Sequence, residues 1–442
     1  MLKMKSKNAV ILTYGCQMNK HDSEIIAGLL QRTGFSIYTE LIDDPDVIIL
    51  NTCAVRQNAE NRILGRIGEL KSFKDSNPEL LIGISGCVAQ EHGSALLDKI
   101  KHLDFVVGPA DIFRIDEILF ELTQDKKKIA MVSGNAGMLT SSTPHIRFNN
   151  TQAWVSIISG CDNFCSYCIV PYVRGREKSR LPEDIEIEIK QLISKNYKEI
   201  NLLGQNVNSY GNDLGDKISF PELLKRISNL PQNFWLRFVT SHPKDLSDEL
   251  INVMAGSEKI CRHLHLPAQS GSTRILTKMN RKYTREHYLG ITEKLLKKMP
   301  DMALTTDIII GFPGETESDF EDTLSLMRAV NFSSAFIFKY SRRKGTAAAE
   351  FKDELPQKII EERHKIALNL QVEISEKFNK NYIGRKVKTL VENVSPKDKN
   401  CLTGRTEHNK IVIFPGSEKL MGEFCDTQIE SSKSWTLFGK MI

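Results

Sequence analysis

Apolar runs of strand length alternate with helical segments through most of this 442-residue chain, and each of the first three runs ends at a cysteine. In the amino-terminal third the runs are Asn8–Cys16, Asp46–Cys53, Leu80–Cys87 and Asp104–Gly108. Continuous apolar runs separated by helical patterns predict a parallel sheet that is covered on both faces. We therefore expect an α/β sheet domain over residues 1–135.

The middle of the chain repeats this alternation after a polar linker at about residues 136–151. Six β/α units predict a partial (βα)6 barrel of the TIM type over residues 147–377, which ends in a long amphipathic helix at Lys358–Asn379. Short alternating strands then predict a small β-barrel, in the size range of OB-like folds, over residues 378–442. The strands expected in the TIM-type barrel are Ala153–Ile158, Glu199–Leu203, Trp235–Val239, Arg262–Leu266, Ala303–Ile310 and Ala335–Phe338.

The cysteine count excludes an ordinary disulfide framework. Nine cysteines is an odd number, and a long chain with no signal peptide indicates a reducing compartment, so metal binding is the better interpretation. No apolar run is long enough to span a bilayer, and we expect a cytoplasmic protein with no membrane partner. The net charge of +5 is mildly basic, which permits a nucleic-acid partner without requiring one.

Cys161, Cys165 and Cys168 form a C-x3-C-x2-C array directly after the first expected barrel strand. Three thiolates at this spacing can hold three corners of a cubane iron–sulfur cluster, and the loop offers no fourth cysteine or histidine to close it. The carboxyl ends of barrel strands are also where such folds build active sites. Zinc is the alternative metal, although structural zinc usually takes four ligands in two pairs; a trio of inert core cysteines is the other alternative.

Cys16, Cys53 and Cys87 are far apart in sequence, but each follows the carboxyl end of a predicted strand. In an open α/β sheet these ends line one crevice, so the three thiols are expected to converge on a second metal site. Coincidental placement of small residues at strand exits is the alternative. The remaining cysteines, Cys261, Cys401 and Cys425, are scattered.

The segment around the array, "ISGCDNFCSYCIVPYVRGREKSR", resembles the radical S-adenosylmethionine (SAM) superfamily. "YGCQMNKHDSE", "VIILNTCAVRQNAENRILGRIGELK" and "GISGCVAQE" resemble the amino-terminal domain of the methylthiotransferases. "YSRRKGTAAA" and a carboxyl-terminal part that resembles a TRAM domain follow in that family's order, across nearly the whole chain. "GCQMN" and "NTCAVRQNAENR" are similar to the MiaB type of this family.

The resemblance implies two 4Fe-4S clusters, one on each cysteine trio, with S-adenosylmethionine bound at the open iron on Cys161, Cys165 and Cys168. That cluster would cleave SAM to a 5′-deoxyadenosyl radical, while the auxiliary cluster would carry a sulfur that a second SAM methylates. The implied reaction is 2-methylthiolation of N6-isopentenyladenosine next to the anticodon of tRNA. No side chain is expected to act as a general acid or base.

Other segments at strand exits fit contacts to the cofactor or to RNA, although each also fits ordinary turn chemistry or a solvated basic face. Candidate SAM contacts are Gly204, Gln205, Asn206, Gln269, Ser270, Arg274, Asp307 and Phe338. Candidate RNA contacts are Arg174, Arg176, Arg342, Arg343, Arg385 and Lys388.

The implied partners are the anticodon stem-loop of a tRNA, an electron donor such as flavodoxin or ferredoxin, and iron–sulfur supply proteins, with the enzyme itself a monomer. Two relatives of the same class are alternatives: one acts on threonylcarbamoyladenosine of tRNA and the other on a ribosomal protein. A non-enzymatic RNA-binding protein with structural metal is a third alternative.

Overall fold

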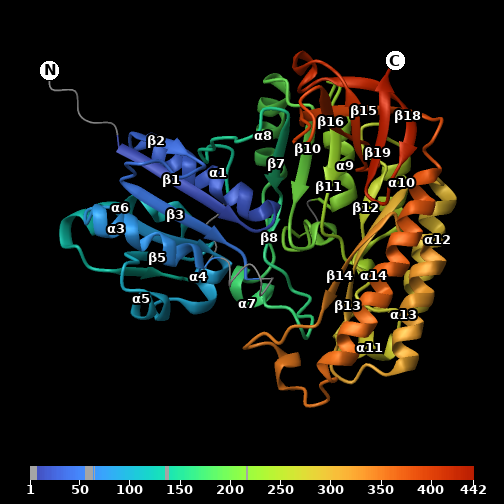
Figure 1. The fold of residues 1–442 in the computed structure, drawn as a ribbon, viewed down its shortest axis with the longest axis horizontal. Helices are drawn as coiled ribbons and strands as arrows, with labels where there is room; N and C mark the ends of the chain where they lie inside the picture. The colour runs from blue at the N-terminus through green and yellow to red at the C-terminus, as the bar shows by residue number, and fades with distance from the viewer. Residues whose placement is uncertain (1–6, 55–62, 64, 135–138, 216–217) are drawn as a thin grey trace.

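Six parallel strands form the amino-terminal sheet in the computed structural model, which describes residues 7–54, 63, 65–134, 139–215 and 218–442 (Figure 1). The sheet order is β2-β1-β3-β4-β5-β6. All six residues of β3 are buried, as the continuous apolar run predicts for a central parallel strand. The strands are β1 (Lys7–Tyr14), β2 (Phe35–Tyr38), β3 (Val47–Thr52), β4 (Leu81–Gly86), β5 (Phe105–Val107) and β6 (Ile129–Met131).

Helices cover both faces of this sheet. On one face α1 and α6 bury Ile25, Leu30 and Ile118 against β1, β3 and β5. On the other face Val88 and Leu96, from α4 and α5, pack in a second core cluster. The helices are α1 (Gln17–Arg32), α3 (Lys71–Ser76), α4 (Cys87–His92), α5 (Ala95–Lys99) and α6 (Ile115–Asp125); most of the stretch expected to be helical between Ala54 and the start of α3 lies outside the described residues.

The sequence predicts four strands here, and the structure adds β2 and β6 at the two edges. Both are short, and no residue in either strand is buried. Edge strands of three or four residues that are half exposed lack the continuous apolar run by which the inner strands are identified.

The predicted partial barrel is confirmed, with six parallel strands in the order β7-β10-β11 followed by β12-β13-β14. A single bridge between Leu236 and Ile260 joins the two halves, and β7 and β14 are the edges. The large core between strands and outer helices contains Ile200, Leu264 and Ile308. The strands are β7 (Gln152–Ser156), β10 (Glu199–Leu203), β11 (Trp235–Phe238), β12 (His263–His265), β13 (Ala303–Ile310) and β14 (Ser334–Lys339), with a small ribbon of β8 (Ile158–Ser159) and β9 (Lys178–Ser179).

The long helix α14 (Gln357–Lys380) covers the outer side of β14, close to its predicted range. Among the described residues, no helix combines the length and the apolar character needed to cross a membrane. The other helices of this part are α7 (Val170–Arg174), α8 (Pro182–Ser194), α9 (Phe220–Ser228), α10 (Asp248–Ala255), α11 (Thr273–Lys278), α12 (Arg285–Lys298) and α13 (Glu317–Val330).

The carboxyl-terminal strands close into the predicted small barrel, in the order β15-β16-β17-β19-β18. All pairings are antiparallel except that between β17 and β19. Val391, Leu402, Val412 and Phe414 fill its core. The strands are β15 (Lys386–Val394), β16 (Cys401–Thr406), β17 (Ile411–Pro415), β18 (Phe424–Ser432) and β19 (Thr436–Met441).

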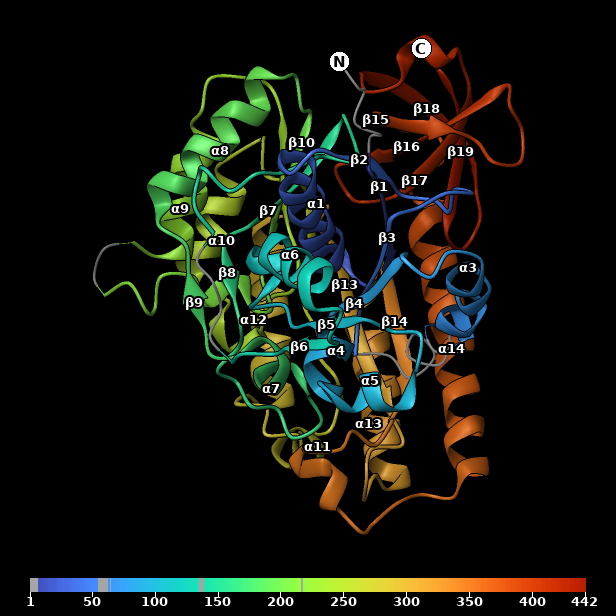
Figure 2. The same ribbon diagram turned by 90° about the vertical axis from the view of Figure 1, so that its left-hand side faces the viewer.

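The small barrel docks against the amino ends of the TIM-type strands, opposite their carboxyl ends. Arg237 donates to the carbonyl oxygens of Thr406 and Glu407 at 3.2 and 3.1 Å, and Lys410 donates to that of Ser333 at 3.1 Å. In both views the small barrel (red) lies at the top of the molecule, while α7 (green) lies in the lower half (Figures 1 and 2).

Candidate iron–sulfur centres

The C-x3-C-x2-C loop leaves the barrel directly after β8 and ends at α7. The Cys161 amide donates to the carbonyl of Gly175 at 3.1 Å, so the start of the loop runs beside the segment that follows α7. Gly160 lies at φ +80°, and a β-carbon there would overlap the Arg176 carbonyl, so only glycine permits this approach. The loop is thereby held at the carboxyl end of the first barrel strand, where its sequence position predicted it.

The loop that follows α11 contacts this array. Arg281 is buried, and its Nη1 donates to the sulfur of Cys165 at 3.4 Å, while its Nη2 donates to the Pro267 carbonyl at 2.9 Å. The Ser166 amide donates to the Met279 carbonyl at 3.0 Å. Arg281 could not be predicted as a site residue, because it lies 116 residues from the cysteine that it contacts.

The array thiols lie in a poorly solvated environment. Burial, and next the neighbouring Cys165, raise the pKa of Cys168 to about 12, and burial also raises the pKa of Cys161. Thiolate ligands must lose their protons on metal binding, so these cysteines need a strongly cationic partner to ionise. Iron ions held by all three sulfurs would supply that charge.

Cys16, Cys53 and Cys87 converge beside the carboxyl ends of β1, β3 and β4, as predicted. Tyr14, Thr52 and Gly86 pair in register across β1, β3 and β4, and the three cysteines follow them by one or two residues. The Cys53 amide donates to the Tyr14 carbonyl at 3.1 Å. From β1 the chain adds β2 on one side of the sheet and then β3 on the other, so β1 and β3 form the topological switch point. Open α/β sheets bind ligands at this point, and Cys16 and Cys53 lie on its two sides.

Hydrogen bonds and a buried arginine link the trio. The hydrogen bond from Cys53, and next the charge of Arg174, lower the pKa of Cys16 to about 6. Arg174 donates from Nε to the Cys87 sulfur at 3.3 Å and from Nη2 to Asp22 at 2.7 Å. Cys53 and Cys87 are 5% exposed, whereas Cys16 is exposed, so one corner of the trio is open to a ligand.

One short helix connects the two trios. Cys168 lies two residues before α7, and Arg174, which touches Cys87, is the last residue of that helix. Ile169 and Val173 pack in the same core cluster as Val88 and Ala89 of the amino-terminal unit. The two centres are therefore joined through five residues of helix and not through a flexible linker.

The candidate SAM contacts after β10 lie beside the array. Gln205 Oε1 accepts a hydrogen bond from the Gly160 amide at 2.7 Å, immediately before Cys161. A β-carbon at Gly204 would press against Ile158, and Asn206 donates to Asp245 at 2.7 Å. Gln205 thus positions the loop, and direct contact of these residues with SAM stays a prediction.

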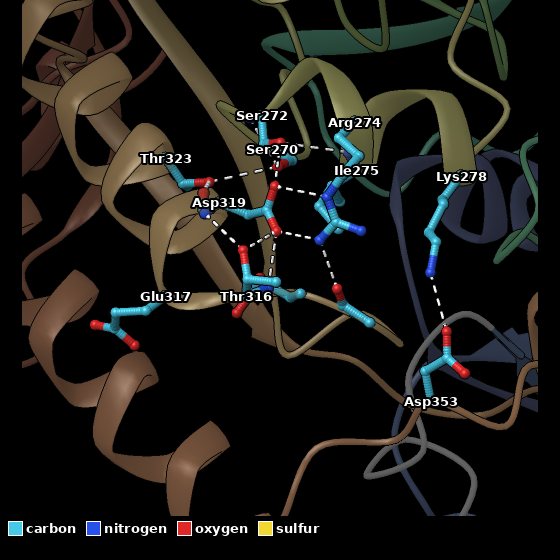
Figure 3. Close-up of polar contacts among 12 residues, drawn as sticks. Ser270, Ser272, Arg274, Ile275, Lys278, Thr316, Glu317, Asp319, Thr323 and Asp353 are labelled. Carbon is cyan, nitrogen blue, oxygen red and sulfur yellow. Dashed lines mark hydrogen bonds and ion pairs between the residues drawn. The ribbon is translucent and has the colours of Figure 1, made fainter.

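The candidates after β12 are held by α13 (Figure 3). Ser270 lies 3.4 Å from the Thr323 hydroxyl, and Arg274 forms an ion pair with Asp319 and donates to the Gly314 carbonyl at 2.6 Å. Gln269 has φ +67° and pairs with Ile308 in an isolated bridge. Their SAM contacts also stay predictions.

Asp319 is the centre of this network, and replacing it by alanine is expected to lower the free energy of unfolding by about 2–4 kcal/mol. Its carboxylate accepts from Ser272 at 2.6 Å and from the Thr316 amide at 2.8 Å, and it pairs with Arg274. Urea denaturation would measure the change. The matched control is Glu321→Ala on the same helix, because Glu321 is exposed and its loss should cost no more than about 1 kcal/mol. Equal losses in the two variants would contradict a central role of Asp319.

Asp307 and Phe338 lie on the inward face of β13 and β14. Asp307 pairs in register with Phe336, and its Oδ2 lies 3.5 Å from His265 Nε2. Phe336 is 54% exposed and stacks on Phe338 with a centroid separation of 6.4 Å. Barrel interiors are normally filled by side chains, so this exposed aromatic ring indicates an inward face that is open to a ligand. The sequence did not single out His265 or Phe336.

The candidate RNA contacts divide between the surface and the interior. Arg176 and Arg342 are exposed, whereas Arg343 is buried and Arg174 lies buried at the first trio. On the small barrel, Arg385 lies over the ring of Tyr382 and Lys388 over that of Phe424, at 6.0 and 4.6 Å. Contact with RNA stays a prediction for all six.

Comparison with known proteins accounts for all three units. Residues 8–108 match the uncharacterized protein family UPF0004, residues 155–327 the Radical SAM superfamily, and residues 380–442 the TRAM domain. A protein of Thermoanaerobacter sp. (strain X514) is 48% identical over 442 residues, which cover 99% of this chain and 94% of the relative. A Carboxydothermus hydrogenoformans protein is 48% identical over 99% of this chain and 100% of its own length. Both are named tRNA-2-methylthio-N(6)-dimethylallyladenosine synthase.

The chain belongs to this synthase family. It is therefore a radical SAM methylthiotransferase, as its motifs predicted. Among solved structures, the radical SAM methyltransferase TsrM from Kitasatospora setae has a TM-score of 0.56 at 13% identity, covering 78% of this chain and 77% of that one. The cobalamin-dependent radical enzyme OxsB has a TM-score of 0.53 at 11% identity, covering 84% and 56%. These two likenesses support the fold alone.

The donor sets fit the two clusters that the sequence motifs predict. Each trio offers three sulfurs from one loop or one sheet edge, and each has a buried arginine that donates to a sulfur. Guanidinium groups stabilise the negative charge of thiolate ligands, and outer-shell hydrogen bonds to sulfur are a regular feature of such centres.

Proposed function

We propose that this protein converts N6-isopentenyladenosine, next to the anticodon of tRNA, to its 2-methylthio derivative. The observation that carries the proposal is the connection of two thiol trios through α7, because a sulfur-donating centre and a radical-generating centre must act on one base. The synthase relatives are 48% identical over 99% of this chain, which supports this assignment.

Cys161, Cys165 and Cys168 would hold the 4Fe-4S cluster that binds SAM, and Cys16, Cys53 and Cys87 would hold a second 4Fe-4S cluster. When bound, these groups supply one-electron cleavage of SAM and a sulfur atom for transfer. Arg281 and Arg174 would stabilise thiolate charge at the two centres by direct donation to sulfur. Gln205 would fix the loop that presents Cys161. The exposure of Cys16 would leave its side of the second centre accessible to substrate.

The position of the small barrel supports a long substrate. It docks at the amino ends of the TIM-type strands, whereas the array lies at the carboxyl end, so one molecule that contacts both must extend along the protein. A tRNA meets that requirement, and an unpaired base of its anticodon loop can be extruded at a cost of a few kcal/mol. We place the enzyme in the cytoplasm as a monomer, with an electron-donor protein and iron–sulfur supply proteins as partners.

Deleting the gene from its host is expected to remove 2-methylthio-N6-isopentenyladenosine from total tRNA and to leave N6-isopentenyladenosine in its place. Mass spectrometry of digested tRNA would measure both nucleosides. Plasmid-borne wild-type protein should restore the product, and the Cys165→Ala variant should not. An unchanged nucleoside profile would reject the proposal, and loss of methylthiolation from threonylcarbamoyladenosine or from a ribosomal protein would favour the corresponding relative.

A further inference from the structure

Phe164 has an unusual position on the outer side of the radical SAM loop. It lies between Cys161 and Cys165, it is 37% exposed, and its backbone has φ +45°. Asn280 Nδ2 donates to its carbonyl at 2.9 Å and so fixes this conformation. A bulky residue held in the left-handed region is strained, and such residues concentrate at functional sites.

Two further exposed side chains complete a patch around this ring. Tyr172 of α7 is 54% exposed and meets Phe164 edge to face, with the ring centroids 6.1 Å apart. Arg176, with its side chain 74% exposed, lies over the Phe164 ring at 5.4 Å and pairs with Asp162 at 2.8 Å. We call Phe164, Tyr172 and Arg176 the Phe164 patch. Exposed aromatic rings with an arginine are the side-chain types that anchor protein interfaces.

The Phe164 patch is the outer surface of the loop whose inner side carries the array. Cys165 directly follows Phe164 and is only 8% exposed. The Glu177 amide donates to Asp162 at 3.1 Å, so the segment that carries Arg176 is bound to the cysteine loop. The Phe164 patch is therefore an exposed surface directly next to the buried cysteine of the array.

The rim of the patch is basic. Lys178 is exposed and pairs in register with Ser159, two residues before Cys161. Lys282 is exposed and adjoins Arg281, whose guanidinium contacts Cys165. Asp162 and Glu177 place two carboxylates among the three cations Arg176, Lys178 and Lys282, so these side chains have a net positive charge and favour an acidic partner. Weak redox encounters use small interfaces, which suits a patch of a few side chains.

We propose that the Phe164 patch is the docking surface for a small acidic one-electron carrier protein that reduces the radical SAM centre. This inference rests on the proposed function, which requires one electron per SAM cleaved. With flavodoxin as the carrier, its flavin hydroquinone is oxidised to the semiquinone with release of one electron to the centre, and no bond in the Phe164 patch forms or breaks. RNA binding at Arg176, which the sequence predicts, is the competing role of this surface.

The test uses the reconstituted holoenzyme with reduced flavodoxin as the probe. In the Phe164→Ala/Tyr172→Ala variant, and separately in Lys282→Glu, the Kd for flavodoxin is expected to rise about tenfold, because a few side chains carry most of the binding free energy of an interface. Formation of 5′-deoxyadenosine driven by subsaturating flavodoxin should fall by a similar factor. With dithionite as the reductant, the rate should stay within about twofold of wild type, because a chemical reductant needs no docking surface.

Matched controls lie on the amino-terminal unit. Phe120 is 67% exposed on α6, and Lys127 is exposed in the following loop, so Phe120→Ala and Lys127→Glu should leave the flavodoxin Kd unchanged. An unchanged Kd in the patch variants, an equal loss with dithionite, or a raised KM for RNA alone would each overturn the inference. If wild-type enzyme forms 5′-deoxyadenosine but no methylthio product, the proposed function fails while the flavodoxin titration still tests the patch.

Discussion

Replacing Cys165 by alanine is expected to lower the iron content from about eight to about four per chain, since each 4Fe-4S cluster holds four irons. Formation of 5′-deoxyadenosine should fall below about one hundredth of wild type, because loss of an outer-shell partner alone commonly costs 10- to 100-fold and a ligand contributes more. Cys165 is the middle cysteine of the array, and its sulfur accepts the hydrogen bond from buried Arg281. Iron analysis after anaerobic purification and chromatography of the nucleoside product would measure both effects.

The control for this variant is another buried cysteine. Cys261 is 2% exposed, as poorly solvated as Cys165, but it packs against Trp235 and Leu390 and lies away from both trios. Cys261→Ala should therefore retain all the iron and the full rate of SAM cleavage. A Cys165→Ala protein with undiminished iron would exclude the array as a cluster site, and zinc in place of iron in wild type would favour the structural-metal alternative.

The parts of the fold that sequence could predict are those with a strong burial signal. β3 and β4 are buried on both faces, so their apolar residues form continuous runs whose ends are easy to locate in the sequence. The long helix α14 begins and ends within one residue of its expected range. β2 and β6 carry no such signal, because an edge strand that is half exposed has the composition of a loop.

The candidate site also has features that the sequence predicts and features that it does not. The convergence of Cys16, Cys53 and Cys87 follows from strand direction alone, because parallel strands bring their carboxyl ends to one edge. The roles of Arg174 and Arg281 depend on contacts across 87 and 116 residues of sequence, which no local pattern encodes. The cationic side chain of Arg174 predicts an RNA contact, but the sequence cannot show that Asp22 pairs with it in the interior.

The two trios should be separable by mutation. Replacing Cys53 by alanine is expected to remove about half of the iron, as loss of one of two four-iron clusters requires. Formation of 5′-deoxyadenosine should stay within about threefold of wild type, because Cys161, Cys165, Cys168 and Arg281 are untouched and core substitutions of this small size cost little. The 2-methylthio product should be undetectable, because the sulfur-donating centre would have lost a ligand. Iron analysis, nucleoside chromatography and mass spectrometry of the RNA product would be made on one preparation.

Loss of methylthiolation with SAM cleavage retained differs from a simple folding defect, which would lower both activities together. Cys425→Ala, on β18 of the small barrel, is the control for cysteine loss outside both trios and should retain both activities. Joint loss of SAM cleavage and methylthiolation in Cys53→Ala would contradict separate function of the two trios and would indicate a structural defect that passes through α7, since Arg174 at its end contacts Cys87. Continued methylthiolation would show that the sulfur does not come from a centre held by Cys16, Cys53 and Cys87, and the assignment of that trio would fail.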